Sequence, residues 1–530
     1  MKKMKGLLLA VIVMLGANGL MAQTYSETAA LFSRTRSVGS ARILGMGGAS
    51  VSLGGDMTSA YSNPAGLGMF NRSEFSISPN FYTFQNKNGN YFSGDTQLSN
   101  GNGDTRTGIN IPALGLVFSK PENDEGFIRG TFAITMMQTN NFNSNLKYSS
   151  GDPNPNTSLI DYFLNDATGY NPSEFDDGGI LHNSVTQLAY DNFLIGEQTI
   201  IGGSDPTQYF TDVTGMAFQN ESIQTKGAQN QWNLSYGANF NDKFFLGAGL
   251  GIVSLNYQST KAYTETFNDD GPLNNFTLTE DLRIRGTGIN FTVGGIVRPV
   301  GGLQLGASVT TPTRYNLTDN YTASMHSSWK NFDYFGDGSR MLNNERADID
   351  VVTSTYTLTT PWKLAFGASY IFGKVGLLSL DIERLNYSTP KYNSQVSGIS
   401  YDQDNQEIKK TYVARTNVRL GGEVRVNAFR FRAGVGIMPD AVSSRPSNVS
   451  NTWTTASVGA GYRKDKFSID LVYMRMFVNG NFKNNNGVIS YDNADANKGN
   501  MYIPYTYANG PSLLYDQSLS SVMCTVGFTF

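Results

Sequence analysis

The sequence predicts an all-β protein, a 14-stranded antiparallel transmembrane β-barrel. Three observations predict it. Segments of about ten residues alternate between apolar side chains and small or polar ones, which places every second side chain on one face of a strand. The connections between these segments alternate between tight turns and long loops, as they do in bacterial outer-membrane barrels. Charged residues make up only 16% of the 530 residues, where a soluble globular domain carries roughly a quarter.

The alternation recurs along the whole chain. At the C-terminus one face is apolar and carries Val522, Cys524, Val526, Phe528 and Phe530, whereas most of the residues between them are small or polar. We expect strand 466–480 to place Leu471 toward lipid and Asp470 toward the lumen. The fourteen candidate strands lie near residues 73–85, 107–119, 128–142, 229–241, 243–262, 279–299, 303–325, 350–372, 376–391, 410–426, 428–440, 453–464, 466–480 and 519–530.

A soluble β-sandwich or propeller also alternates, because one face of each sheet covers a core. The exposed face of such a sheet usually carries Lys and Glu. Here the polar face is rich in Gly, Ser, Thr and Asn, and aromatic residues such as Trp232, Phe372 and Tyr462 stand at strand ends, where interfacial girdles belong. We therefore favour the barrel, which must close because an open strand edge would leave backbone groups unpaired in hydrocarbon.

The connections have two lengths. The tight ones are residues 241–242, 299–302, 373–375, 427 and 464–465. The connections between them are longer, and the longest spans about 143–228. An even number of strands places both chain ends on the short-turn side, which is periplasmic in outer-membrane barrels.

The first 22 residues predict a signal peptide. Lys2, Lys3 and Lys5 precede an apolar run that is too short to span a membrane, and a small-residue cleavage site ends at Ala22. The exported chain then begins at Gln23 and contains no uninterrupted apolar stretch of spanning length. We therefore expect a Gram-negative outer-membrane protein that crosses the membrane with strands.

Composition excludes several classes of function. A net charge of −3 without a basic stripe argues against nucleic acid as a partner, since binding to phosphates needs a surplus of Lys and Arg. Cys524 is the single cysteine, so neither an intrachain disulfide nor a Cys-rich zinc site can form. His182 and His326 lie far apart and in no recognisable nucleophile motif. We expect no catalytic residue, no metal site, no cofactor and no enzymatic activity.

Residues 23–72 differ from the strands in composition and pattern: they are rich in small residues and show no sustained alternation. Residues 40–49 read SARILGMGGA and residues 60–67 read AYSNPAGL. A phosphate-binding loop is rejected because Ser50 stands where the third Gly of that motif belongs. The segment resembles the N-terminal hatch of the FadL family of outer-membrane transporters, which carry long-chain fatty acids and other hydrophobic compounds and include the TodX-like members.

The resemblance implies fourteen strands, a hatch of residues 23–72 that plugs the lumen, and a terminal aromatic residue, here Phe530, that contacts the barrel-assembly machinery. Asn63, Pro64 and Ala65 match the hatch motif, and Gly66 suits the turn that follows. The residues themselves agree with a plug. Fourteen strands with Gly- and Ser-lined inner faces leave a bore that must be filled. The alternative is that residues 63–66 are only a turn leading into the barrel.

Charged residues gather on the predicted inner face of three neighbouring strands. They are Asp381, Glu383, Arg419, Glu423, Arg425, Arg430 and Arg432. Arg419, Arg425, Arg430 and Arg432 are candidate ligand-binding residues, because a guanidinium group binds a carboxylate through two hydrogen bonds. An ion-pair ladder that fastens the hatch or stiffens the wall is the alternative that we favour.

The long connection after residue 143 carries apolar residues at helical spacing, namely Leu159, Ile160, Phe163 and Leu164, followed by Val185, Leu188 and Ala189. These form either a groove that captures a hydrophobic ligand or the packing that a long loop needs.

Two functions follow. The first is passive uptake of a hydrophobic small molecule, driven by transfer of apolar surface, in a barrel surrounded by outer-membrane lipid. The second is a FadL-like barrel that binds a protein cargo in a secretion system, which the long connection and the tyrosines Tyr502, Tyr505, Tyr507 and Tyr515 would suit.

Overall fold

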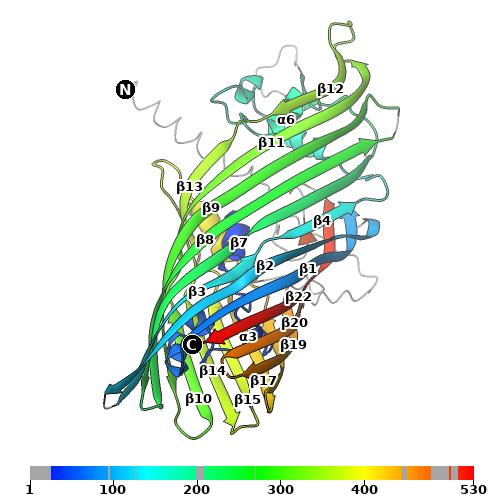
Figure 1. Cartoon of the computed structure of the whole chain (residues 1–530). Helices are drawn as coiled ribbons and strands as arrows, with labels where there is room; N and C mark the ends of the chain where they lie inside the picture. Colours follow the sequence, from blue (N-terminus) through cyan, green and yellow to red (C-terminus); the bar gives the residue numbers. More distant parts are fainter. Residues whose placement is uncertain are drawn as a thin grey trace, which may run out of the picture.

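The protein forms a closed antiparallel β-barrel, seen in a computed structural model (Figure 1). The structure describes residues 25–93, 96–124, 126–198, 208–268, 270–443, 451–478, 501–502 and 511–530. The predicted signal peptide, Gln23, Tyr505 and Tyr507 lie outside the described residues. Twenty strand segments form one sheet, and they make fourteen passages. The predicted fold class is confirmed.

The barrel closes where the last strand, β22 (Pro511–Thr529), pairs along its length with the first, β1 (Glu74–Ser93). We call this pairing the closure seam. The other passages follow in chain order: β2 (Thr96–Asp124), β3 with β4 (Phe127–Asn141, Ser144–Ser149), β7 (Ala217–Phe240), β8 (Phe244–Phe267), β9 (Leu273–Val297), β10 with β11 (Leu303–Thr310, Arg314–Asp333), β13 with β14 (Val352–Thr359, Lys363–Phe372), β15 with β16 (Gly376–Asn386, Lys391–Ser394), β17 (Ala414–Val426), β18 (Phe429–Met438), β19 (Trp453–Lys464) and β20 (Phe467–Val478).

Two proline residues interrupt neighbouring passages at the same place. Pro312 separates β10 from β11, and Pro361 separates β13 from β14, because proline has no N–H for the ladder. The wall stays continuous there: Thr360 N donates to Thr313 O at 3.0 Å, and Thr313 N donates to Thr360 Oγ1 at 2.9 Å.

The predicted tight turns are confirmed. Asn241 and Asp242 between β7 and β8 both have positive φ, 54° and 52°. This is the backbone conformation of the two-residue hairpin turn whose twist matches that of the flanking strands. Asn427 and Asp465 adopt positive φ in two other short turns. The C-terminus lies at this end of the barrel, where Phe530 N donates to Ser73 O at 3.0 Å.

At the other end the strands are longer than alternation predicts. The expected long connection over residues 86–106 is wrong, because β1 continues to Ser93 and β2 begins at Thr96. Strands β7, β8 and β9 likewise extend far beyond the rest of the wall (Figure 1). The extensions of β1 and β2 are rich in Asn, Gly, Ser and Thr. Backbone pairing holds them, so no apolar period marks them in the sequence, whereas β8 and β9 keep apolar residues such as Leu255 and Leu278 on a buried face.

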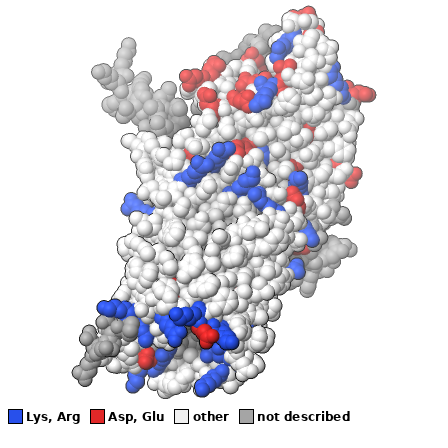
Figure 2. Space-filling model, in the orientation of Figure 1, with Lys and Arg blue, Asp and Glu red and all other residues white. Residues whose placement is uncertain are grey.

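The outer face is apolar and the inner face is small and polar, the reverse of a soluble sheet. Phe366, Phe372 and Leu471 are more than half exposed on the outside, at 59%, 52% and 51%. Asn233 and Asp470 are at most 7% exposed on the inside. A broad uncharged band crosses the surface between Lys and Arg residues near the short-turn end and charged residues farther along (Figure 2). This is the surface of a membrane-spanning barrel.

The longest connection packs on itself. It runs from residue 150 to 216 and holds α5 (Leu159–Ala167), η3 (Pro172–Phe175), α6 (Val185–Asp191) and a hairpin of β5 (Gly196–Gln198) and β6 (Gln208–Phe210). Leu159, Phe163 and Leu188 are fully buried. They belong to one apolar cluster with side chains of the extended strands. The geometry therefore favours loop packing over an open groove.

Other short elements complete this end of the barrel. They are β12 (Met341–Asp348), which pairs with β11, α7 (Asp402–Thr411) between β16 and β17, and β21 (Met501–Tyr502), which pairs with β22. Among the described residues, no helix is long and apolar enough to cross a membrane.

We expect Leu471→Arg to lower the folding stability of the barrel by roughly 2–4 kcal/mol if the residue lies near the membrane midplane, because the charge would face lipid. Heat-modifiable mobility in gels and urea titration of protein refolded into vesicles measure the effect. Leu471→Met is the matched control and should fold as the wild type does. Equal stability of the two variants would mean that Leu471 does not face lipid.

Candidate functional site

The N-terminal segment, residues 25–72, lies against the inner face of the barrel. It contains α2 (Tyr25–Ser33), α3 (Ala41–Leu44), α4 (Ser59–Ser62) and the 3₁₀ helix η2 (Pro64–Met69). Two of its helices begin at residues that cap them: Ser40 Oγ accepts from Ile43 N in α3, and Asn63 Oδ1 accepts from Ala65 N in η2. Gly47 and Gly48 have positive φ, 69° and 88°, which lets the chain reverse after α3.

Helix α2 lies toward the long-connection end of the lumen. The ring of Tyr25 meets those of Tyr356, Tyr392 and Tyr401 edge-on, with centroids 5.0–5.3 Å apart. Ser26 Oγ donates to Glu407 of α7 at 3.0 Å. That both chain ends lie on the short-turn side stays a prediction for the N-terminus, which lies outside the described residues. The first described residue, Tyr25, lies toward the long-connection end, because the N-terminal segment runs along the lumen before β1.

A row of wall glycines receives the N-terminal segment. Gly247 lies opposite Gly237 and Gly294 in the strand register, Gly306 opposite Gly367, and Gly421 opposite Gly434. A Cβ at any of these positions would overlap atoms of the segment. At Gly237 and Gly247 it would overlap Pro64, and at Gly294 it would overlap Asn63. At Gly306 and Gly367 it would overlap Val51 and Ser52, and at Gly421 and Gly434 it would overlap Met46 or Gly47. The absent side chains therefore let the backbone of the segment lie directly against the wall.

Asn63 is fully buried and joins the segment to the wall. Its amide donates to Val51 O at 2.7 Å within the segment and to Gly295 O and Ala307 O at 3.2 and 3.3 Å on β9 and β10. Its side-chain oxygen also caps η2. Pro64, Ala65 and Gly66 follow in η2 and are buried. Asn63, Pro64 and Ala65 thus contact the wall, in a position that a simple turn into β1 would not need, whereas Gly66 packs against Leu53 and Ser59 of the segment itself.

Carboxylates of the wall hold the segment as well. Asp381 on β15 accepts hydrogen bonds from Ser50 N and Val51 N at 2.6 and 2.8 Å. Glu383 accepts from Thr35 Oγ1 at 2.6 Å and pairs with Arg419 at 3.0 Å. Charged acceptors bind backbone and hydroxyl donors more strongly than neutral ones do.

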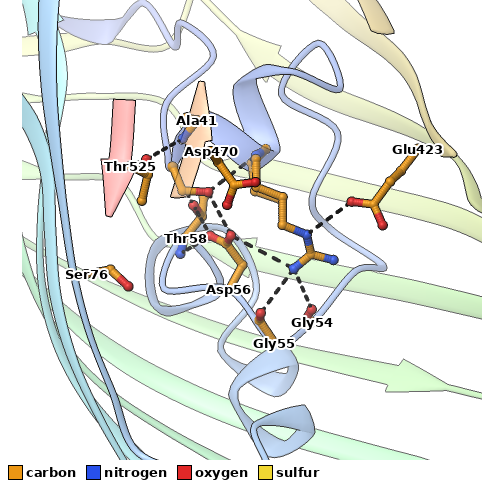
Figure 3. A network of polar contacts seen from close by, with 12 residues as sticks. Ala41, Gly54, Gly55, Asp56, Thr58, Ser76, Glu423, Asp470 and Thr525 are labelled. Carbon is orange, nitrogen blue, oxygen red and sulfur yellow. Dashed lines mark hydrogen bonds and ion pairs between the residues drawn. The ribbon is translucent and has the colours of Figure 1, made fainter. Parts of the chain in front are cut away.

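Figure 3 shows a polar network that includes Gly55, Asp56 and Glu423, and the hydrogen bond and ion pairs of these residues place Arg42 of α3 at its centre. Its guanidinium donates to Gly55 O at 3.0 Å and lies 3.9 Å from Asp56 and 3.8 Å from Glu423 of β17. Burial alone would lower the pKa of Arg42, but Glu423 and Asp56 outweigh it and raise that pKa. Asp56 in turn accepts from Ser40 Oγ at 2.7 Å and from Thr58 N at 2.9 Å. The network ties two turns of the segment to the wall.

The four candidate ligand-binding arginines divide into three groups. Arg432 pairs with Glu423 at 2.8 Å and with Asp470 at 2.6 Å, and Arg425 also pairs with Glu423 at 2.8 Å. Arg419 pairs with Glu383. Arg430 lies apart at the short turn, where it donates to Asn427 O and Phe429 O. The geometry favours the ion-pair ladder, since Arg419, Arg425 and Arg432 already have carboxylate partners.

Sequence reasoning assigned no role to Arg42, Asp56 or Arg36. Arg42 and Asp56 stand inside the Gly-rich motif, and their opposite charges fourteen residues apart were the available signal. Arg36 precedes the motif in a polar stretch without periodicity.

Of the tyrosines considered for cargo binding, Tyr515 is partly buried beside the cluster of Tyr91 and Tyr148.

No protein-family model matches the chain, and no curated protein matches it. Among solved structures, a Pseudomonas aeruginosa FadL homologue is similar over 93% of this chain and 98% of its own, with 14% sequence identity and a TM-score of 0.52. The toluene transporters TodX of Pseudomonas putida (12% identity, 94% and 99% covered, TM-score 0.48) and TbuX of Ralstonia pickettii (12%, 93% and 98%, 0.45) are also similar. The first likeness shows that this chain has the fold of the FadL homologue.

We expect Gly294→Ala to displace the N-terminal segment while the barrel still folds, because the new methyl group would overlap Asn63. Gly295→Ala is the matched control on the next residue, where the nearest atom is 3.6 Å away. Ion conductance in planar bilayers measures the result, and gel mobility checks folding. Equal conductance of the two variants would contradict close contact at Gly294.

Arg42→Gln should lower the free energy of unfolding by about 3 kcal/mol, because it leaves buried carboxylates without their cation. Thermal unfolding in detergent measures it. The control is Arg346→Gln, whose ion pair with Asp348 is exposed and should matter by less than about 1 kcal/mol. Similar losses in both variants would show that the Arg42 network does not stabilise the lumen.

Proposed function

We propose that this protein takes up long-chain fatty acids or other hydrophobic small molecules passively across the outer membrane of a Gram-negative bacterium. In this proposal the N-terminal segment is a hatch that closes the lumen and moves to let a ligand pass. The observation that carries it is a membrane-spanning barrel whose bore is filled by a segment of its own chain, seated on a row of wall glycines.

The bonding of the segment suits movement. After α2, whose Ala29, Ala30 and Phe32 belong to the large apolar cluster at the long-connection end, the apolar contacts of the segment with the wall are divided among small clusters, such as Ala41 and Leu44 with Met474 and Met523. Between these clusters the contacts are polar: Asn63, Asp381 and the Arg42 network. Polar contacts of this kind exchange with water at modest net cost, so a partial shift of the segment would not expose a large apolar surface.

Cavities adjoin the segment on two sides. One lies against the closure seam and is bordered by residues of β1, β2, β3, β20 and β22, and the other lies against β10, β14, β15 and β17. Residues 36–38 border both. A hydrophobic molecule entering from the long-connection end would gain apolar contacts in the first cavity, and this transfer of apolar surface from water supplies the driving force. The likeness in fold to the FadL homologue supports the same class of ligand.

Locking the segment to the wall tests the proposal. Ser308 Oγ donates to the backbone oxygen of Ser62 at 2.8 Å, so the two residues are neighbours across the contact between segment and wall. Ser62→Cys with Ser308→Cys, in a Cys524→Ser background, is therefore the pair to cross-link, and loss of free thiols on oxidation checks that the disulfide forms. We expect the oxidised double variant to take up radiolabelled oleate at least tenfold more slowly than the reduced one, in cells that lack their own outer-membrane fatty-acid transporter.

The two single-cysteine variants under oxidant are the controls. Equal uptake by the locked and reduced proteins would overturn the movable hatch and leave uptake standing. Uptake no faster than in cells without the protein, for oleate and for toluene alike, would overturn the transport function.

A further inference from the structure

Arg36 is a cation of the lumen without a counter-ion. It lies between α2 and α3, and within the described part of the chain its guanidinium makes no hydrogen bond or ion pair; its Nε is buried without an acceptor. The guanidinium instead lies over the ring of Trp453, with Cζ 5.5 Å from the ring centroid. Burial, together with the like charge of Arg34, lowers the pKa of Arg36 to about 10. Arg42, Arg419 and Arg432, by contrast, all have carboxylate partners.

A second buried donor lies beside it. The indole Nε1 of Trp453 is buried and has no acceptor among the described residues. Buried N–H groups without acceptors are rare in folded proteins because each loses its hydrogen bond to water. Because the guanidinium of Arg36 lies over the same indole ring, two donors that lack an acceptor among the described residues stand close together, which leaves a place for an acceptor that this part of the chain does not supply.

The cavity at Arg36 has the form that an amphiphile needs. On the side of the closure seam it is bordered by Leu44, Met474, Met476, Leu519 and Met523. Trp453 packs with Met476 and Leu519 in the same apolar cluster. Methionine side chains adapt to apolar chains of varied shape. A guanidinium therefore stands at one end of an apolar surface inside the barrel.

We propose that Arg36 binds the anionic head group of an amphiphilic ligand, with the indole of Trp453 beside it and the apolar chain along Met474, Met476 and Met523. Arg36 then selects anionic amphiphiles over neutral hydrophobic molecules. This inference rests on the proposed function and moves the head-group site from the wall arginines to the N-terminal segment. A guanidinium suits carboxylate and phosphate groups alike, since both accept paired hydrogen bonds. Because no described carboxylate pairs with Arg36, a ligand need not displace one in this part of the chain.

Binding to the purified full-length protein in detergent tests the inference, with octanoate, octyl phosphate and octan-1-ol as probes of equal chain length. We expect the wild type to bind at least one of the two anions tenfold or more tightly than octan-1-ol. Arg36→Gln should reduce that ratio to about one. Whichever anion binds more tightly identifies the head group as carboxylate or phosphate.

Thermal unfolding of the ligand-free variants separates binding from structure. Arg36→Gln should melt at the temperature of the wild type or above it, because it removes a buried charge that has no partner. Trp453→Phe should reduce the preference for the anion severalfold and keep that for chain length. Arg384→Gln, an exposed arginine on the outer face of β15, is the control and should leave the ratio unchanged.

Three results would overturn the inference. Equal binding of octan-1-ol and both anions, unchanged in Arg36→Gln, would place the head group elsewhere and leave the proposed function intact. A lower melting temperature of Arg36→Gln with an unchanged preference would make Arg36 structural. Failure of every probe to bind would overturn the proposed function together with the inference.

Discussion

Backbone hydrogen bonding in a medium without water is the constraint on which the rest of the structure depends. Each N–H and C=O group in the hydrocarbon region needs a partner within the protein. The pairing of β22 with β1 supplies it for the last open edge. Closure then fixes two surfaces of opposite character: an outer face that meets lipid through residues such as Phe366 and Leu471, and an inner face that cannot be filled by the short side chains it carries.

The N-terminal segment packs into the space that the short side chains of the inner face leave. Wall glycines such as Gly247 and Gly434 would be weak points in an ordinary strand, but here the backbone of the segment occupies the space beside them. Close backbone approach brings Asn63 and Asp381 within hydrogen-bonding distance of their partners. Small wall residues and a small-residue segment thus complement each other, and neither is explained without the other.

Charged side chains inside the lumen also complement one another, because most of the arginines named above pair with carboxylates. Arg42 and Arg432 share Glu423, and Arg419 meets Glu383, so these cations stabilise the closed arrangement. Arg36 differs because the chain provides it with no acceptor among the described residues. The paired arginines account for how the segment is held, and Arg36, which has no carboxylate partner among the described residues, is the cation left for the ligand that we propose.

The sequence by itself determined the strands of the membrane region, their faces and their short turns, because those depend on local rules: period-two alternation, and Asn or Asp residues that tolerate positive φ, as at Asn241 and Asp242. It also marked residues 63–66 as special. Tertiary structure decided the rest. The polar ends of β1, β2 and β7 are held by neighbouring strands and leave no apolar period. Carboxylates hundreds of residues away decide which arginines are neutralised, as Arg42 and Glu423 show. The distances between such side chains are set only when the barrel closes around its own N-terminal segment.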